Sequence, residues 1–168
     1  MKKLLAAIAA TLLFGASLFA EGYISANDID LGKITSDRKE EDGFIIHGAQ
    51  KAIEVTKDDV KIKGEKFTQR FKMGGSALEK GGAPVCYISF PAKKGETVTI
   101  YGLSSSKTEA RVAEIYNTAD KSVVKALPMG VYDKENASVV SFKIPADGRY
   151  AVGSKHSTIY IYNINVSK

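Results

Sequence analysis

The chain has few cysteines and histidines, the residue types that disulfides, metal centres and many catalytic sites use. Its only cysteine is Cys86, so an internal disulfide is impossible. Its only histidines are His47 and His156, and neither stands at metal-ligand spacing from a partner. No stretch repeats at helical spacing, which argues against a parallel α/β architecture. We therefore expect no catalytic residue, no enzyme activity and no cofactor.

The chain also lacks a large excess of one charge. Its formal net charge is +5 over 168 residues, and it falls to +3 if Lys2 and Lys3 are removed with a leader. Nucleic-acid binding calls for clustered Lys and Arg in a much larger excess. The composition therefore predicts no nucleic-acid partner, and the length suits one domain with a sizeable core.

The first 20 residues have the layout of a secretory signal peptide. Lys2 and Lys3 precede an apolar run over residues 4–14, and small residues precede Ala20. The run is too short to span a bilayer comfortably, since a spanning helix needs roughly 20 apolar residues. We predict cleavage after Ala20, a single domain over residues 21–168 with no membrane span, and export to the periplasm or beyond.

From Gly43 onward, short apolar or alternating runs are separated by Gly, Pro, Asn and Asp. Such spacing is typical of an all-β protein, and we predict an antiparallel β-sandwich of the jelly-roll kind. An N-terminal strand is expected around Ile29–Leu31, followed by a loop, and a turn is expected at residues 57–59. The other predicted strands cover residues 44–46, 52–55, 60–63, 67–73, 85–90, 97–103, 111–116, 122–126, 138–144, 150–153 and 158–166.

Alternation within these runs assigns faces to side chains. Val140, Phe142 and Ile144 alternate with polar residues and should face the core. The last run, residues 159–166, is apolar on both faces over its first half. It lies centrally in its sheet, or it exposes an aromatic pair on one face. Cys86 lies in an apolar run and is predicted to be buried and unreactive.

A further pattern is carried by residues 42–46, 67–76, 88–90, 95–104, 111, 142–150 and 159–162. These segments resemble the accessory β-sandwich domains attached to bacterial pectate lyases. The resemblance spans nearly the whole mature chain, although this sequence contains no catalytic β-helix and no tryptophan to serve as a sugar-stacking platform. It implies a non-catalytic module that binds a polysaccharide, in particular an acidic, pectin-like one.

The run over residues 67–73 supplies the first candidate ligand contacts. Alternation places Arg70 and Lys72 on the face opposite Phe67, Phe71 and Met73. A guanidinium beside an ammonium can bind the carboxylates of an acidic sugar polymer. Two other interpretations remain open: both cations form an ordinary solvated face, or Arg70 is buried and paired with a carboxylate such as Glu114.

Residues elsewhere in the chain complete the predicted ligand-binding set. Arg111 and Ser104 can add hydrogen-bond donors, while Tyr101 and Tyr162 can offer surfaces on which sugar rings stack. Tyrosines in strands also serve as ordinary core or cross-strand packing. The competing hypothesis is a structural or adhesion protein that binds a protein partner through a sheet edge or face.

Acidic residues offer two further alternatives. The pairs Asp28/Asp30 and Asp58/Asp59 could serve glycoside chemistry, which needs two carboxyl groups flanking the bond. Carboxylates in such positions are more often turn residues. The same turns, or the run Glu40–Asp42, could hold a structural calcium ion through oxygen ligands, although no regular calcium-loop pattern is present.

Overall fold

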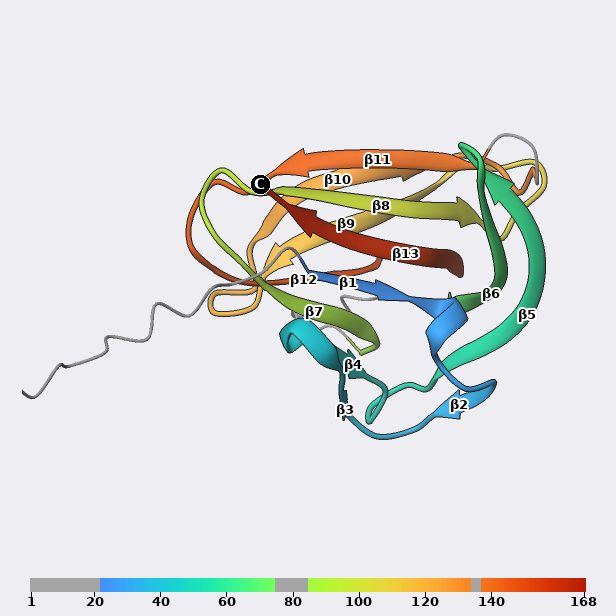
Figure 1. Cartoon of the computed structure of the whole chain (residues 1–168), viewed down its shortest axis with the longest axis horizontal. Coiled ribbons are helices and arrows are strands. Elements are labelled where there is room, and N and C mark those ends of the chain that lie inside the picture. The colour runs from blue at the N-terminus through green and yellow to red at the C-terminus, as the bar shows by residue number, and fades with distance from the viewer. Residues whose placement is uncertain (1–21, 75–84, 134–136) are drawn as a thin grey trace, which may run out of the picture.

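The computed structural model describes residues 22–74, 85–133 and 137–168. These residues form two antiparallel sheets packed face to face, which confirms the predicted all-β sandwich (Figure 1). The seven-stranded sheet consists of β1 (Gly22–Ser25), β2 (Gly32–Ile34), β5 (Ile53–Ile62), β6 (Glu65–Met73), β8 (Thr97–Ser104), β11 (Ser138–Lys143) and β13 (Ile159–Ser167). The six-stranded sheet consists of β3 (Arg38–Lys39), β4 (Ile45–His47), β7 (Tyr87–Ala92), β9 (Arg111–Asn117), β10 (Val123–Met129) and β12 (Gly148–Ser154).

The N-terminal region differs from the expectation. The predicted strand around Ile29–Leu31 is absent, and strands form on either side of it as β1 and β2. Between them lies the 3₁₀ turn η1 (Ala26–Asp28), which the side chain of Ser25 caps by accepting a hydrogen bond from the Asn27 amide. A second 3₁₀ turn, η2 (Glu41–Gly43), precedes β4. Within the described part of the chain, no helix is long and apolar enough to cross a membrane.

The main core lies between the two sheets. Ile100 and Ile164 contribute from the seven-stranded sheet, and Phe90 and Val152 contribute from the six-stranded sheet. Ile144 is buried, and Val140 and Phe142 pack against the same cluster, which confirms the face predicted for this run. β13 lies between β8 on one side and β6 with β1 on the other, so the central placement of the last strand is also confirmed.

β5 is one continuous strand where the sequence predicted two strands and a turn. The expected turn at residues 57–59 is a β-bulge, because the pairing with β6 shifts register between Lys57 and Val60. A bulge inserts an extra residue and bends the strand. β5 and β6 accordingly curve together at one end of the molecule (Figure 1).

The curved end of the β5–β6 hairpin builds a second, smaller hydrophobic cluster away from the main core. Val60, Ile62 and Phe67 of the hairpin pack there against Leu103 of β8 and Tyr162 of β13. Leu103 and Tyr162 lie on the outer face of the seven-stranded sheet, since their neighbours Gly102 and Ile161 face the main core. The hairpin therefore covers part of that outer face.

A second bulge lies in β13, between Ile161 and Asn163. Strict alternation from Ile159 and Ile161 would place Asn163 and Asn165 in the core. The bulge reverses the phase, so Ile164 and Val166 are buried in their place. Asn163 pairs with Tyr101 and Asn165 pairs with Tyr23, which puts their side chains on the outer face.

Candidate functional site

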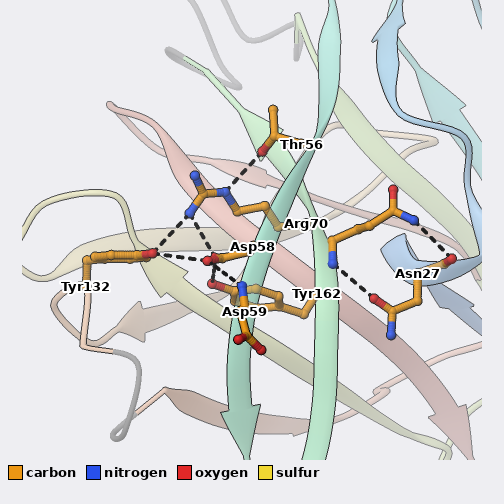
Figure 2. Close-up of polar contacts among 8 residues, drawn as sticks. Asn27, Thr56, Asp58, Asp59, Arg70, Tyr132 and Tyr162 are labelled. Carbon is orange, nitrogen blue, oxygen red and sulfur yellow. Dashed lines mark hydrogen bonds and ion pairs between the residues drawn. The ribbon is translucent and has the colours of Figure 1, made fainter.

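Arg70 lies in a network centred on the carboxylate of Asp58 (Figure 2). Arg70 Nη1 donates to Asp58 Oδ2 at 2.9 Å, and Arg70 Nε donates to Thr56 Oγ1 at 3.1 Å. The guanidinium carbon also lies 3.7 Å from the ring centroid of Tyr160. The side chains of Arg70 and Asp58 are only 17% and 4% exposed. Arg70 is thus paired with a buried carboxylate, Asp58, and a role in ligand binding stays a prediction.

Three further groups bind the Asp58 carboxylate. The hydroxyls of Tyr162 and Tyr132 donate to it at 2.8 and 3.2 Å, and the backbone amide of Asp59 donates at 2.9 Å (Figure 2). Burial on its own raises the pKa of Asp58, but these hydrogen bonds and the charge of Arg70 outweigh it and hold the pKa below its ordinary value. Asp58 is therefore a buried, ionised anchor that ties the hairpin to β13.

Glu114, the carboxylate proposed as a partner of Arg70, belongs to the other sheet. Its side chain is 7% exposed, and its Oε1 lies 3.5 Å from the Nζ of Lys155. Glu114, named as one example of a partner, therefore does not pair with Arg70. Asp58, which lies in the bulge of β5, does.

Lys72 projects from the same face of β6 as Arg70, as predicted, but it too has an anionic partner. Its Nζ lies 3.0 Å from Oε2 of Glu54, the residue directly opposite on β5. Hydrogen bonding to Lys72 and its charge lower the pKa of Glu54. Lys72 is 44% exposed. Both cations of the predicted pair thus face carboxylates of the protein itself.

Arg111 and Ser104 are separate from this pair. Arg111 starts β9 in the six-stranded sheet, and its Nη1 donates to Ser105 Oγ and to the carbonyl of Thr158, both at 2.6 Å. Ser104 is fully buried, and its hydroxyl donates to the carbonyl of Glu109 at 2.7 Å. The two residues hold the loop after β8 in place, and a role in ligand binding stays a prediction for both.

The predicted tyrosines have different surroundings. Tyr162 is fully buried in the second cluster, with its ring 5.5 Å from that of Phe67. Tyr101 is only partly buried, and its ring centroid lies 5.7 Å from that of Phe67. Tyr101 therefore keeps a surface that a ligand can reach, whereas Tyr162 contributes its hydroxyl to the Asp58 network.

Tyr101 belongs to a groove on the outer face of the seven-stranded sheet. The groove has a volume of about 330 Å³ and is lined by Gly22, Tyr23, Glu65, Tyr101, Asn163 and Asn165. Tyr23 is 55% exposed, the highest value among the large apolar side chains described. The Oδ1 atom of Asn163 is buried and has no hydrogen-bond partner among the described residues.

Of the six residues that line the groove, only Tyr101 was among the predicted ligand-binding residues. Apolar residues occupy odd positions at Ile159 and Ile161 but even positions at Ile164 and Val166. This change of phase within one strand is the signature of a bulge, and it would have assigned Asn163 and Asn165 to the outer face. Aromatic rings beside amide groups suit ligands that combine apolar faces with hydroxyl groups.

His47 lies in a chain of polar contacts that the sequence did not suggest. Its Nδ1 is 2.8 Å from Asp37 Oδ2 and its Nε2 is 2.9 Å from Ser89 Oγ. The order carboxylate, imidazole, hydroxyl is that of a nucleophilic triad. Ser89, however, is fully buried, and its Oγ accepts a hydrogen bond from Arg149 Nη1 at 3.0 Å. A substrate cannot reach this hydroxyl, so the contacts serve to join β4, β7 and β12.

The acidic candidates do not form a metal centre in the described residues, where no group of three or more His, Cys, Asp or Glu side chains is placed to hold an ion. Asp28, Glu40, Glu41 and Asp42 do line one pocket, but Glu40 forms an ion pair with Arg38. Asp58 is engaged with Arg70, as described above. A structural calcium site stays a prediction without specific support.

Cys86 is fully buried, as predicted, and its thiol lies 3.5 Å from the carbonyl oxygen of Gly74. Burial raises the pKa of Cys86 above its ordinary value, which disfavours the reactive thiolate. Its low reactivity stays a prediction.

The exposed large apolar side chains of the described residues are Tyr23, Leu31 and Val123, from three different segments. This scatter gives no specific support to the alternative of a protein-binding face.

The sequence matches no protein-family profile and no curated protein. Solved structures do resemble it. A structure connected with glycan recognition in the Ruminococcus flavefaciens cellulosome has a TM-score of 0.50 at 13% identity, covering 88% of this chain and 93% of that one. A carbohydrate-binding module from Clostridium stercorarium, solved with cellobiose, has a TM-score of 0.47 at 10% identity, over the same shares of the two chains. At such low identity the first likeness is evidence for the fold alone. The chain has the two-sheet β-sandwich of the Ruminococcus flavefaciens protein.

Proposed function

We propose that this protein is a non-catalytic carbohydrate-binding module that acts outside the cytoplasm. The observation that carries the proposal is the groove lined by Tyr23, Tyr101, Asn163 and Asn165. Its two rings and two amides come from three adjacent strands of one sheet. A sugar ring has an apolar face that can lie on a tyrosine and hydroxyls that can exchange hydrogen bonds with amides.

Two other observations support the proposal. The likeness to the Ruminococcus flavefaciens structure, which is connected with glycan recognition, agrees with a binding role for the fold. The signal-peptide layout of residues 1–20, which lie outside the described residues, agrees with export to the periplasm or beyond. The sequence resemblance adds an association with pectate lyases to the proposal, as a setting in which such a module would act.

The proposal is tested by binding the purified protein to a panel of soluble and insoluble polysaccharides, with Tyr23→Ala, Tyr101→Ala and Leu31→Ala beside the wild type. Leu31 is a matched control, because it is 49% exposed against 55% for Tyr23 and does not line the groove. Loss of a stacking ring should cost about 1 kcal/mol, or about fivefold in affinity. Leu31→Ala should bind like the wild type.

Two results would contradict the proposal: no member of the panel is bound, or a bound glycan is indifferent to both tyrosine substitutions. Because Tyr101 also packs on Phe67, its variant needs a thermal melt beside the binding assay. Tyr101→Phe, which keeps the ring, should retain the stacking contribution.

A further inference from the structure

Among the residues that the structure describes, one charged side chain lines the groove. Of its six lining residues, Glu65 is the only acidic one and none is Lys or Arg. The other five lining residues are uncharged, so Glu65 supplies the only charge in the described lining of the groove. Burial is the largest cause that raises the pKa of Tyr101, and the nearby negative charge of Glu65 is the second. The two side chains are therefore close enough to act on the same part of a bound ligand.

The hairpin fixes Glu65 in this position. Glu65 opens β6 opposite Ile62, after a two-residue turn in which Lys63 and Gly64 have φ values of 47° and 94°. Positive φ at both central residues is the mark of the tight type I′ hairpin turn. Ile62 and Phe67 on either side of the turn are buried in the second cluster. Packing therefore restrains the tip of the hairpin beside the groove.

The three basic residues of β6 face carboxylates other than Glu65. Lys66 does not line the groove, and its Nζ lies 3.6 Å from Asp59 Oδ1. Arg70 and Lys72, the cations first expected to bind an acidic polymer, contact Asp58 and Glu54. No cation of the described residues thus lines the groove to offset Glu65.

We propose that Glu65 is the specificity-determining residue of the groove and that it selects uncharged glycans over acidic ones. This inference rests on the proposed function. A carboxylate accepts hydrogen bonds from the hydroxyls of a neutral sugar, and such charge-assisted bonds are the stronger kind. The same carboxylate repels the carboxylate of a uronic acid and offers it no donor. The groove therefore favours a ligand that is the opposite of the pectin-like polymer suggested by the sequence resemblance.

The test measures the affinity of the wild type, Glu65→Gln and Glu109→Gln for neutral and uronic-acid oligosaccharides of equal length. The neutral probes are cello-, xylo- and manno-oligosaccharides, and the acidic probe is oligogalacturonate. Glu109→Gln is the matched control, because it makes the same change of charge on an exposed residue outside the groove. The wild type should prefer a neutral probe by about tenfold or more, which corresponds to about 1.4 kcal/mol. Glu65→Gln should lower that preference several-fold, and Glu109→Gln should leave it unchanged.

Added salt provides a second readout. Salt screens exposed charges, so it should strengthen the binding of the acidic probe to the wild type but not to Glu65→Gln. A wild type that prefers oligogalacturonate, or a preference that Glu65→Gln does not change, overturns the role of Glu65 and leaves glycan binding intact. If no glycan of either class is bound, the proposed function fails and this inference falls with it.

Discussion

At the scale of single residues, two buried tyrosines show that the effect of a hydroxyl on stability depends on its hydrogen-bond partner. Tyr162 donates to the buried carboxylate of Asp58 at 2.8 Å. Tyr116 is 1% exposed, and its hydroxyl has no hydrogen-bond partner among the described residues. Burial raises the pKa of both phenols well above the ordinary value. The two hydroxyls are therefore equally inaccessible but should differ in their effect on stability.

Replacing each of these tyrosines with phenylalanine should separate the two cases. Tyr162→Phe removes a hydrogen bond to a charged acceptor and should lower the free energy of unfolding by about 1.5–3 kcal/mol. Tyr116→Phe removes a hydroxyl that is desolvated without compensation, so it should be neutral or stabilising. Urea titrations of the two variants measure the difference. A loss of stability in Tyr116→Phe as large as that in Tyr162→Phe would contradict the assignment of partners.

At the scale of elements, β6 has an edge that only part of a strand covers. β13 pairs with β6 through Phe71–Met73 and then pairs with β1. Beyond that point the side chain of Asn27 takes over. Its Oδ1 accepts from the backbone amides of Thr68 and Gln69 at 2.9 and 3.1 Å, and its Nδ2 donates to the carbonyl of Lys66 at 3.3 Å. One asparagine in η1 thus satisfies backbone groups at this edge of β6, as a neighbouring strand would, at the point where the hairpin leaves the sheet.

Asn27→Ala should therefore loosen the hairpin locally more than it destabilises the whole protein. The affected amide of Thr68 is near solvent, so water can replace the lost partner and the global cost should be about 1 kcal/mol. Amide hydrogen exchange should become faster at Thr68 and Gln69, while amides in the main core stay protected. Unchanged exchange at these two amides would show that Asn27 does not secure the edge. Asn27→Asp, which keeps the acceptor but loses the donor to Lys66, should give an intermediate result.

At the scale of the whole molecule, the Asp58 network couples the stability of the fold to pH. The pKa of Asp58 in the folded protein lies below the ordinary value of 3.8. The folded state thus binds the proton less readily than the unfolded state does. A group with this sign stabilises the fold fully above its unfolded pKa, and the contribution disappears as the pH falls through the folded pKa.

The free energy of unfolding should therefore fall as the pH is lowered below about 4. Asp58→Asn should be less stable than the wild type at neutral pH, because Arg70 then has no buried counter-charge. It should also lose less stability on acidification, because the titrating group is gone. Urea titrations from neutral pH to about pH 2.5 measure both effects. Equal acid sensitivity in the two proteins would mean that other carboxylates govern the response.

The amino-acid sequence by itself determined the class of the fold. Alternating apolar residues, short runs and turn residues specify strands and the faces they bury, and these are local properties. For this reason the sandwich, the central position of β13 and the burial of Cys86 and of Ile144 could all be predicted. The two strand bulges were not predicted, although changes in the phase of the apolar residues in residues 53–62 and 159–166 mark them in the sequence.

Only the tertiary structure decided which polar side chains meet. Alternation placed Arg70 and Lys72 on one face but could not supply their partners, because Asp58 reaches Arg70 through the curvature that the β5 bulge produces. The groove has the same origin. Tyr23, Glu65, Tyr101 and Asn163 come from four strands that are distant in sequence, and the strand pairing and the folded hairpin bring them together. Contacts of this range depend on the register between strands and on their twist, which no local pattern encodes.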